Sequence, residues 1–409
     1  VLVDQKFGHD FTQSQDSILQ TVVPWSNPMT PSSSLGLSGE RFAVHYHVKG
    51  AEADARRKAE AICLDQTVEM SAELVPNEEI RNHILGRLEG FRPIALDVYE
   101  AVVSFAVEVT GSELPHLLQT VFGMLSLKPG IQVSSIELSE SLLDGMSGPR
   151  YGRAGLREKV GQPQRPLLCG VLKPVGLCVA DLAKLAYSYA LGGLDIIKDD
   201  QGLANQAFCP FEERVRRCAE AVGKANQQTG RNALYLPNVT GPFDQILPRA
   251  LFAGEAGAGG LLICPGMTGF DVIRCLAVHK NLALPILSHP SGLGSLIVHD
   301  DTGIAPSVLF GQLPRIFGVD ASLFPVFGRD FSISRDQCAQ IAGETGKPLR
   351  HMKAILPAVG GHLGLERIPE ILELFGMEVM VVVGGTLLQH PNKVAETCQN
   401  LVRAVERSC

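Results

Sequence analysis

Between residue 167 and residue 400, short apolar runs alternate with helical stretches eight times. Each run is apolar through its body and ends in polar, Gly or Pro residues, and such runs predict strands that are buried on both faces. The runs are "LLCGVL" (167–172), "LDIIK" (194–198), "ALYLPN" (233–238), "GLLICP" (260–265), "LPILSH" (284–289), "ASLFPV" (321–326), "KAILPA" (353–358) and "VMVVVGG" (379–385). This even spacing predicts a TIM (β/α)8 barrel, because a doubly wound sheet seldom has eight such strands.

The preceding part of the chain has a different pattern, in which strands and helices are mixed. "RFAVHYHV" alternates as a strand does, "AEADARRKAEAICL" has helical spacing, and "PIALDVYEAVVSFAVEV" predicts two further strands. "ELPHLLQTVFGML" predicts a helix, and "IQVSSIELSESLL" predicts another strand. Strands followed by a helix, repeated, predict a small α+β domain of the ferredoxin-like kind.

These patterns divide the chain into four parts. Residues 1–40 are rich in Ser, Pro, Gln and Thr and predict an extended arm. Residues 41–144 are the α+β domain, and residues 145–166, which carry Gly, Pro and Arg with little periodicity, predict a linker. Residues 167–409 are the barrel. The predicted fold is therefore α/β, with a C-terminal TIM barrel that follows a small α+β domain.

Composition narrows the function classes. Of the 409 residues 45% are hydrophobic and 19% are charged, and the net charge of −7 argues against a general nucleic-acid or anionic-membrane surface. No run of 18 or more apolar residues and no signal-peptide pattern occurs, so we expect a cytoplasmic protein without a membrane span. The ten cysteines are scattered without CxxC pairs, which predicts reduced buried thiols rather than disulfides or structural zinc.

Unusual residues gather where the predicted barrel strands end, which is where TIM barrels carry their active sites. They are Lys173, Lys198, Asp199, Asp200, Asn238, Thr240, His289, Arg329, Gly360, Gly361, Gly384, Gly385 and Thr386. Two lysines, a carboxylate pair and a histidine suit removal of a proton beside a carbonyl, which needs a base and a cation to hold the enolate. The glycine pairs follow strands seven and eight, where barrels bind phosphate through backbone N–H groups.

Each of these residues also has an ordinary structural interpretation. Lys198 could be ion-paired with its neighbouring aspartates, His289 could be a hydrogen-bonded structural residue, and Gly-Gly pairs are most often turns. The functional interpretation is favoured because independent structural features would not gather at one rim.

The order of motifs resembles ribulose-bisphosphate carboxylase/oxygenase (RuBisCO), and in detail the non-carbon-fixing RuBisCO-like proteins called form IV. The matching pieces are "GVLKPVGL", "GGLDIIKDD", "NVTG", "FGRD", "GGTLLQHP" and, in the first domain, "TVFG". The resemblance implies that Lys198 reacts with CO2 to form a carbamate that binds Mg²⁺ together with Asp200. Gln201 stands where the carboxylase has a glutamate ligand. Its uncharged amide implies either a weaker Mg²⁺ site or a dispensable metal.

The resemblance also implies roles around the substrate. Lys173 matches a lysine near the enolising carbon, and His289 and Asn238 match substrate-contacting positions. Gly361, Gly384 and Gly385 match a phosphate cradle. The residues that grip a second phosphate are absent, because Pro290 replaces an arginine and the segment 321–323 lacks a histidine. A monophosphate with an apolar or uncharged far end is therefore implied.

Other matches concern carboxylation and assembly. Arg329 replaces the loop lysine that stabilises the carboxylated intermediate, and a guanidinium is no simple substitute for an ammonium group. Asp65 and Thr67 align loosely with an acid and a threonine of the family's first domain, and Thr120 stands where the carboxylase has an asparagine. In this family the first domain of one subunit completes the partner's barrel, which implies a homodimer with the active site at the interface.

We expect an enzyme that enolises or isomerises a sugar monophosphate such as 5-methylthioribulose 1-phosphate, rather than a carboxylase. Two alternatives remain open at this point. One is decarboxylation or carboxyl transfer on a 3-oxo sugar-acid phosphate of the 3-oxo-isoapionate 4-phosphate type, with Arg329 on the substrate carboxylate. The other is a non-catalytic binding or stress protein.

Overall fold

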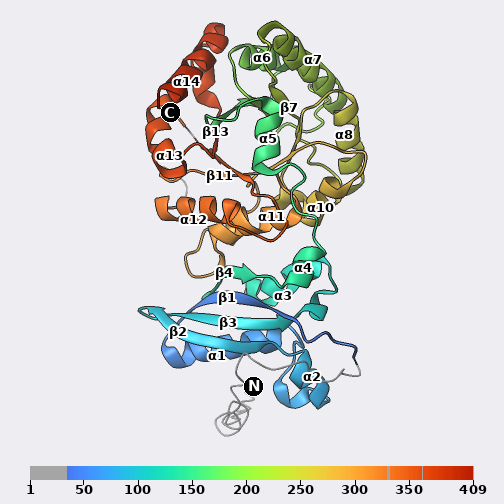
Figure 1. Ribbon diagram of the computed structural model, residues 1–409, viewed down its shortest axis with the longest axis vertical. Helices are drawn as coiled ribbons and strands as arrows, with labels where there is room; N and C mark the ends of the chain where they lie inside the picture. Colours follow the sequence, from blue (N-terminus) through green and yellow to red (C-terminus); the bar gives the residue numbers. More distant parts are fainter. Residues whose placement is uncertain (1–34, 329–331, 362, 409) are drawn as a thin grey trace, which may run out of the picture. The chain divides into compact units, whose positions relative to one another are not determined.

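The computed structural model describes residues 35–328, 332–361 and 363–408 (Figure 1). Residues 40–409 form one compact unit, so the predicted α+β domain and barrel belong to the same body. Of the predicted arm, residues 1–34 lie outside the described residues.

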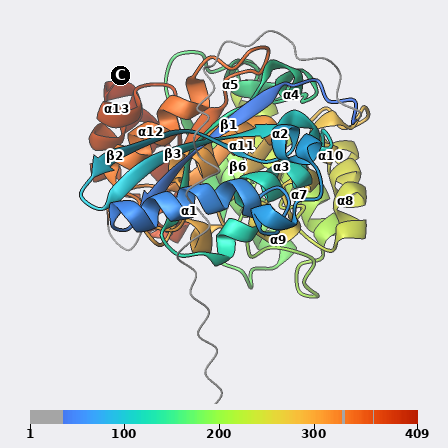
Figure 2. The same cartoon turned by 90° about the horizontal axis from the view of Figure 1, so that it is seen from below.

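The α+β domain is built on a five-stranded sheet in the order β10-β4-β1-β3-β2. Its longest ladder pairs β1 (Arg41–Lys49) antiparallel with β3 (Val98–Ala106) over nine residues, and β2 (Arg87–Ala95) and β4 (Ile131–Glu137) flank that pair. Helix α1 (Glu52–Asp65) packs on β1, β2 and β3 through its buried Ala55, Ala59 and Ile62, and Figure 2 shows it running along the sheet. The predicted α+β class is confirmed.

One strand of this sheet was not predicted. The two-residue strand β10 (Gly303–Ile304) comes from the loop between two barrel strands and pairs parallel with β4. Two residues carry too little periodicity to be recognised in a sequence. Through β10 the sheet of the first domain includes a piece of the second half of the chain.

All eight predicted barrel strands are present in one parallel sheet. Its order is β7-β6-β5-β13-β12-β11-β9-β8, and a bridge between Asn238 and Leu262 brings the two end strands together. The strands are β5 (Leu167–Leu172), β6 (Ile196–Asp199), β7 (Leu234–Leu236), β8 (Leu261–Ile263), β9 (Ile286–Ser288), β11 (Ala321–Pro325), β12 (Leu356–Gly360) and β13 (Met380–Val383). The predicted TIM barrel is confirmed.

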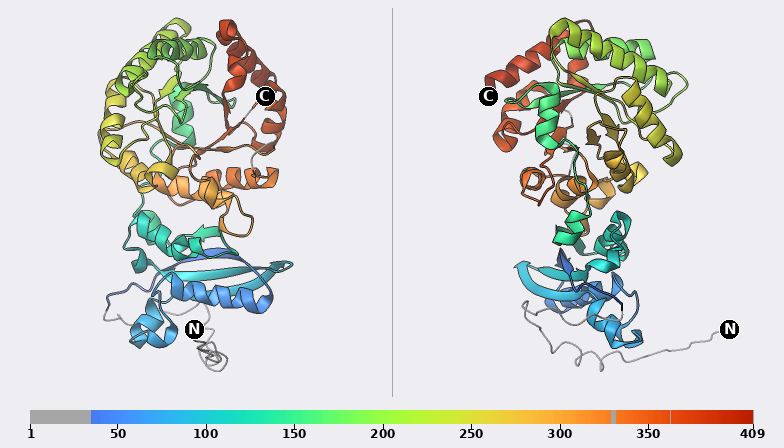
Figure 3. Two further views of the ribbon diagram at one scale, coloured as in Figure 1. Left: turned by 180° about the vertical axis from the view of Figure 1, so that it is seen from behind. Right: turned by 45° about the vertical axis from the view of Figure 1, so that its right-hand side comes forward.

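Helices follow the strands and lie outside them (Figures 1 and 3). Helix α7 (Phe211–Thr229) shows why, because its apolar side chains recur every three or four residues and are buried on one face. The helix ends before Gly230, which has the left-handed conformation. The other helices are α2 (Glu78–His83), α3 (Leu114–Phe122), α4 (Glu140–Asp144), α5 (Gly152–Val160), α6 (Val179–Leu191), α8 (Phe243–Glu255), α9 (Pro265–Thr268), α10 (Asp271–Val278), α11 (Leu313–Phe317), α12 (Arg335–Gly346), α13 (Ile368–Phe375) and α14 (Val394–Ser408).

Residues 145–166, which the sequence predicted as a linker, contain helix α5. Leu156 and Val160 of this helix are buried in the same apolar cluster as the inward-facing strand residues. The carboxylate of Asp320, at the start of β11, accepts hydrogen bonds from the backbone N–H groups of Tyr151 and Gly152, both at 2.7 Å. Two apolar positions four residues apart are too few to show a helical period, so the sequence pattern missed this helix.

Two expectations from composition have a structural counterpart. Among the described residues nine cysteines are free, and six of them are buried. None of the described helices has the length and apolar character needed to cross a membrane.

Candidate active site

Lys198 is buried at the end of β6, with 1% of its surface exposed. By strand alternation it lies on the same side of β6 as Ile196, which belongs to the apolar cluster inside the barrel. Its Nζ donates a hydrogen bond to the backbone oxygen of Asp199 at 3.1 Å. Burial lowers the pKa of Lys198, because desolvation disfavours the charged amine. Some uncharged, nucleophilic amine is therefore available.

Asp199 points to the other side of β6 and is fully buried. Its carboxylate accepts hydrogen bonds from Arg214 Nε at 3.0 Å, the Tyr235 hydroxyl at 2.8 Å and the Asn238 backbone N–H at 3.1 Å. Burial, and then the Asp199 charge, raises the pKa of Tyr235 well above its usual value, so the phenol stays protonated and donates. The contacts of Asp199 are those of a structural anchor.

Asp200 carries the carboxylate that faces the barrel mouth. Its Oδ2 lies 3.3 Å from Nζ of Lys173, which follows β5, and its Oδ1 accepts the backbone N–H of Gly202 at 2.9 Å. Lys173 is about one-third exposed, whereas Asp200 is nearly buried. An amine is thus held by a carboxylate at the rim.

Gly384, after β13, brings the last strand end against the same lysine. A Cβ at this position would lie 3.3 Å from both Cε and Nζ of Lys173, which is closer than ordinary contact. Thr386 then donates a hydrogen bond to the backbone oxygen of Leu363, joining the loops that follow β13 and β12. The glycine predicted from the sequence therefore lies beside Lys173, the lysine predicted to act near the enolising carbon.

His289 follows β9 and is close enough to Lys198 and Lys173 for their charges to act on its ring. Its Nδ1 accepts the backbone N–H of Ser291 at 3.2 Å and lies 3.0 Å from the Ser291 hydroxyl. Because a backbone N–H can only donate, the proton of the neutral ring is on Nε2. Burial, and then the charges of Lys198 and Lys173, lowers the pKa of His289 to about 3. The ring therefore acts as an uncharged hydrogen-bond donor.

This lowered pKa predicts a pH dependence of stability. Between the ordinary pKa of 6.5 and about 3, the unfolded chain binds a proton at His289 that the folded chain does not. Folding stability therefore falls as the pH drops through this window, and we expect the thermal midpoint of His289→Gln to fall less steeply below pH 6.5. Calorimetry at a series of pH values measures this. Equal slopes in the two proteins would contradict the assignment.

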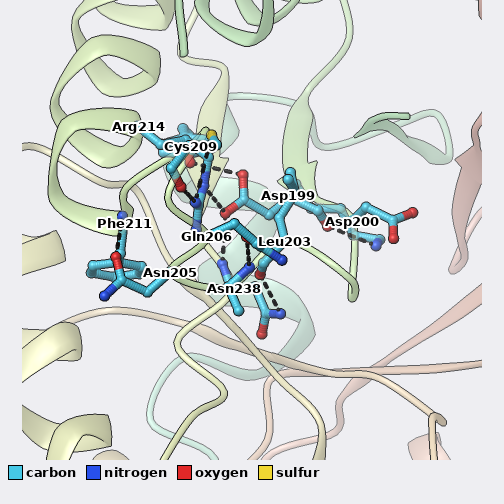
Figure 4. Close-up of polar contacts among 12 residues, drawn as sticks. Asp199, Asp200, Leu203, Asn205, Gln206, Cys209, Phe211, Arg214 and Asn238 are labelled. Atoms are coloured by element: carbon cyan, nitrogen blue, oxygen red, sulfur yellow. Dashed lines mark hydrogen bonds and ion pairs between the residues drawn. The ribbon is translucent and has the colours of Figure 1, made fainter. Parts of the chain in front are cut away.

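The loop that carries Asp200 is held by two of its own side chains and by Asn238, which follows β7 (Figure 4). Asn238 Nδ2 donates to the backbone oxygens of Gln201 and Leu203 at 3.1 and 2.9 Å. Gln206 Nε2 donates to the backbone oxygen of Gly202, and Asn205 Oδ1 accepts the first backbone N–H of α7. The arrangement makes the loop a fixed platform for the Asp200 carboxylate.

An apolar cavity adjoins His289. Its lining includes Pro290 after β9 and Leu323 of β11, together with Phe270, Phe310 and Phe317. The lining residues are apolar apart from Ser288 and His289, and nothing in this set could neutralise a phosphate dianion. The two positions at which a bisphosphate enzyme was expected to carry cationic groups thus lie in one apolar surface.

Comparison with known proteins agrees with this geometry. Residues 152–324 match the family described as "Ribulose bisphosphate carboxylase large chain, catalytic domain". Ribulose bisphosphate carboxylase-like protein 1 of Rhodopseudomonas palustris is 35% identical, over 87% of this chain and 95% of that protein. A crystal structure of a Rubisco-like protein from the same organism has a TM-score of 0.82 and 31% identity, covering 90% of this chain and 97% of that one.

This chain belongs to the RuBisCO-like proteins. Among its relatives are proteins with named activities. The 5-methylthioribulose-1-phosphate isomerase of Rhodospirillum rubrum is 34% identical over 90% of this chain and 96% of that enzyme. The 2,3-diketo-5-methylthiopentyl-1-phosphate enolase of Geobacillus thermodenitrificans is 34% identical over 83% of this chain and 86% of that enzyme.

The residues of this RuBisCO-like protein fit a magnesium ion only weakly. In the described part of the chain no group of three or more His, Cys, Asp or Glu side chains is arranged to hold a metal. Asp200 offers a hard carboxylate oxygen that already faces a cation, the Lys173 ammonium. The buried Lys198 amine could provide a second anionic oxygen as a carbamate, and the exposed Gln201 could provide only a neutral one.

The structure brings four predicted site residues into one electrostatic cluster: Lys173, Lys198, Asp200 and His289. The charges of both lysines lower the pKa of His289, and the charge of Asp200 acts to raise that of Lys198. Contact of Asn238 with substrate stays a prediction. Both of its amide N–H groups are used by the loop, so contact with substrate would require breaking those bonds. Gly361 and Gly385 follow β12 and β13 as expected, and their phosphate role stays a prediction. Arg329 lies outside the described residues.

The three site residues predicted in the α+β domain lie at one corner of it. Asp65 ends α1 and pairs with Lys128, and the hydroxyl of Thr67 donates to the backbone oxygen of Cys63. The buried Gln66 between them donates to the backbone oxygen of Thr120 in α3 at 2.8 Å. Their contribution to an active site stays a prediction.

Sequence reasoning missed Arg214 and Tyr235, whose side chains donate hydrogen bonds to the Asp199 carboxylate. Arg214 lies on the buried face of α7 and is fully buried. A charged residue among the apolar positions of a helix, at a spacing that places it inward, was the available signal.

Proposed function

We propose that this RuBisCO-like protein enolises or isomerises a phosphorylated keto sugar, with 5-methylthioribulose 1-phosphate as the leading candidate. The observation that carries the proposal is the Lys173–Asp200 ion pair at 3.3 Å, seated against Gly384 at the barrel rim. It supplies an amine beside the position expected for phosphate. The names of the relatives support the same reaction class.

In the proposed reaction Lys173 first loses its ammonium proton to solvent, and the neutral amine then removes the proton from the carbon next to the substrate carbonyl. The electrons of the broken C–H bond form the C=C bond of an enediolate, and the carbonyl oxygen takes up the negative charge. For isomerisation the hydroxyl proton of the first carbon moves to the enolate oxygen, and return of the abstracted proton from Lys173 to the former carbonyl carbon gives the isomer. His289 would donate its Nε2–H to a substrate oxygen throughout, since it stays uncharged.

Lys198 as a carbamate, Asp200 and the Gln201 amide oxygen would hold Mg²⁺, the cofactor proposed for this site. When bound, the ion would supply positive charge where the enediolate develops. The neutral Gln201 implies weak binding. The thiols near Lys198 are not alternative nucleophiles, because burial raises the pKa of Cys169 to about 12 and also raises that of Cys264.

The apolar cavity beside His289 supports a monophosphate. The cavity has room for only about one water molecule, so an uncharged substrate end such as a methylthio group could contact Pro290 at its edge but could not enter it. The absence of a cationic grip in this lining also argues against a bisphosphate substrate and hence against ribulose-bisphosphate carboxylation.

The proposed reaction is tested by incubating the protein in D2O with 5-methylthioribulose 1-phosphate and Mg²⁺ under CO2. We expect deuterium to enter the substrate at the enolising carbon and the isomerised product at the former carbonyl carbon, with no CO2 release, measured by NMR and mass spectrometry. CO2 release from a 3-oxo sugar-acid phosphate, without exchange into the keto sugar, would favour decarboxylation. No exchange into a broad panel of sugar phosphates would favour a binding protein.

We further propose a homodimer whose active sites lie at the subunit interface. Exposed apolar side chains follow four consecutive barrel strands: Val175, Phe208, Phe243 and Met267. A second exposed apolar group lies in the α+β domain near the predicted site residues: Met70, Leu74, Met124 and Leu127. A second copy of this chain could cover the first group with the second. The free thiols of the described residues support a reducing, cytoplasmic compartment.

Co-expression of two inactive variants tests the shared site. Lys198→Ala removes the barrel function, and the double variant Asp65→Ala/Thr67→Ala removes the α+β contribution. Random pairing would then leave about a quarter of the sites intact, and we expect that share of activity. Lys198→Ala co-expressed with Lys173→Met is the control, because both barrels are then defective. Activity equal to this control would contradict a shared site.

A further inference from the structure

A single buried side chain pins the turn that carries the proposed metal ligands. Asn238, 1% exposed, donates from Nδ2 to the backbone oxygens of Gln201 and Leu203, and its Oδ1 accepts the backbone N–H of Thr240 at 3.2 Å. The turn itself is closed by Leu203, whose backbone N–H donates to the backbone oxygen of Asp200 at 3.0 Å. Asn238 therefore touches both sides of this turn from another strand.

Asn238 is itself held in place by a buried ionic anchor (Figure 4). Its backbone N–H donates to Asp199 Oδ2, which also receives Arg214 Nε, and Tyr235 donates to the other carboxylate oxygen. These groups come from β6, β7 and α7. A continuous set of hydrogen bonds thus runs from a barrel helix to the backbone on either side of Gly202.

We propose that Asn238 is a positioning residue that sets the location of the Asp200 carboxylate, rather than a substrate ligand. The inference rests on the proposed function, in which Asp200 both holds Lys173 and binds Mg²⁺. Asp200 Oδ1 is satisfied within the turn by Gly202, so Oδ2 alone faces Lys173. A turn free to shift would carry that oxygen with it, and loss of such supporting contacts typically lowers metal affinity 10–100-fold.

Asn238→Asp tests the inference, because it removes both amide donors and places a carboxylate opposite two carbonyl oxygens. Asn238→Ser, which adds no charge, is the milder second variant. The matched control is Asn226→Asp on α7: Asn226 also donates to and accepts from one backbone, that of Ala233, both at 2.9 Å. The control therefore breaks the same kind of bond before β7, away from the turn.

Two measurements are made on the full chain. Amide hydrogen exchange of the 199–209 segment, without metal, is expected to accelerate at least about tenfold in both Asn238 variants and to stay unchanged in Asn226→Asp. Mn²⁺ affinity, measured by electron paramagnetic resonance in bicarbonate, is expected to weaken about 10–100-fold in Asn238→Asp and less than about twofold in the control.

Unchanged exchange in the 199–209 segment of both Asn238 variants would overturn the inference. Faster exchange with wild-type Mn²⁺ affinity would also overturn it, because the turn would then be pinned without positioning Asp200. Wild-type protein that binds no Mn²⁺ contradicts the metal part of the proposed function instead. In that case the inference stands or falls on kcat for deuterium exchange, which should drop at least about tenfold in Asn238→Asp at nearly constant KM.

Discussion

Replacing Lys173 with Met is expected to lower deuterium exchange into the sugar phosphate about 10³-fold, with little change in substrate affinity. Removal of a positioned acid–base group typically costs 10²–10⁴-fold in rate. The loss should be this large because Lys173 is paired with Asp200 and packed against Gly384, whereas the other amine of the cluster, Lys198, is buried. The rate of exchange is followed by NMR in D2O, and affinity by inhibition with a non-reacting analogue.

The matched control is Lys224→Met. Lys224 forms an ion pair with Glu220 on α7 at 2.6 Å, with both side chains more than half exposed. This variant removes a charge of the same kind from the surface and should exchange deuterium at the wild-type rate. Exchange in Lys173→Met within about tenfold of wild type would remove Lys173 from the role of base. The proton would then have to pass through another group of the cluster.

The constellation at the rim could be predicted from the sequence because it depends on where strands end. Eight apolar runs mark the strands, and parallel strands in a barrel deliver their carboxyl ends to one face. Lys173, Asp200, His289 and Gly384 each lie at the end of such a run or within two residues after it. Their gathering therefore follows from topology, and an error of one or two residues in a strand boundary does not change it.

The function of an individual side chain depended on facts that the pattern does not contain. Asp199 and Asp200 are adjacent in the chain, yet strand alternation sends one toward Arg214 and the other toward Lys173. Asn238 follows a strand as the site residues do, but its amide is used by the neighbouring turn. To decide whether such a residue acts at the barrel rim or holds the fold in place, one must know which partners lie within hydrogen-bond distance.

The same limit applies to α5 and β10. Each is defined by what it packs on, α5 by the inner apolar cluster and β10 by β4, rather than by its own composition. Strand β10 has only two residues and α5 buries only two large apolar side chains, Leu156 and Val160, so neither shows a period. Tertiary contact thus decides the short elements, while periodicity decides the long ones.

Arg214→Met is expected to destabilise the protein by about 3–5 kcal/mol, because it leaves the Asp199 charge buried without its partner. Arg214 and Asp199 are both fully buried, and Nε of the arginine lies 3.0 Å from Oδ2 of the aspartate. A methionine fills much of the same volume but provides no donor. The measurement is the thermal midpoint by calorimetry, and a loss of this size corresponds to a fall of several degrees.

Two further variants separate the buried charge from the loss of packing. Arg216→Met removes an arginine from the same helix, where its ion pair with Glu212 is exposed, and should cost less than about 1 kcal/mol. Adding Asp199→Asn to Arg214→Met removes the unpaired charge and keeps an acceptor for Tyr235, so part of the lost stability should return. If the double variant were less stable than Arg214→Met, the cost would lie in the lost hydrogen bonds of Asp199 and not in its unpaired charge. In that case Asp199 and its partners would stabilise the protein through the geometry of their hydrogen bonds and not through charge pairing.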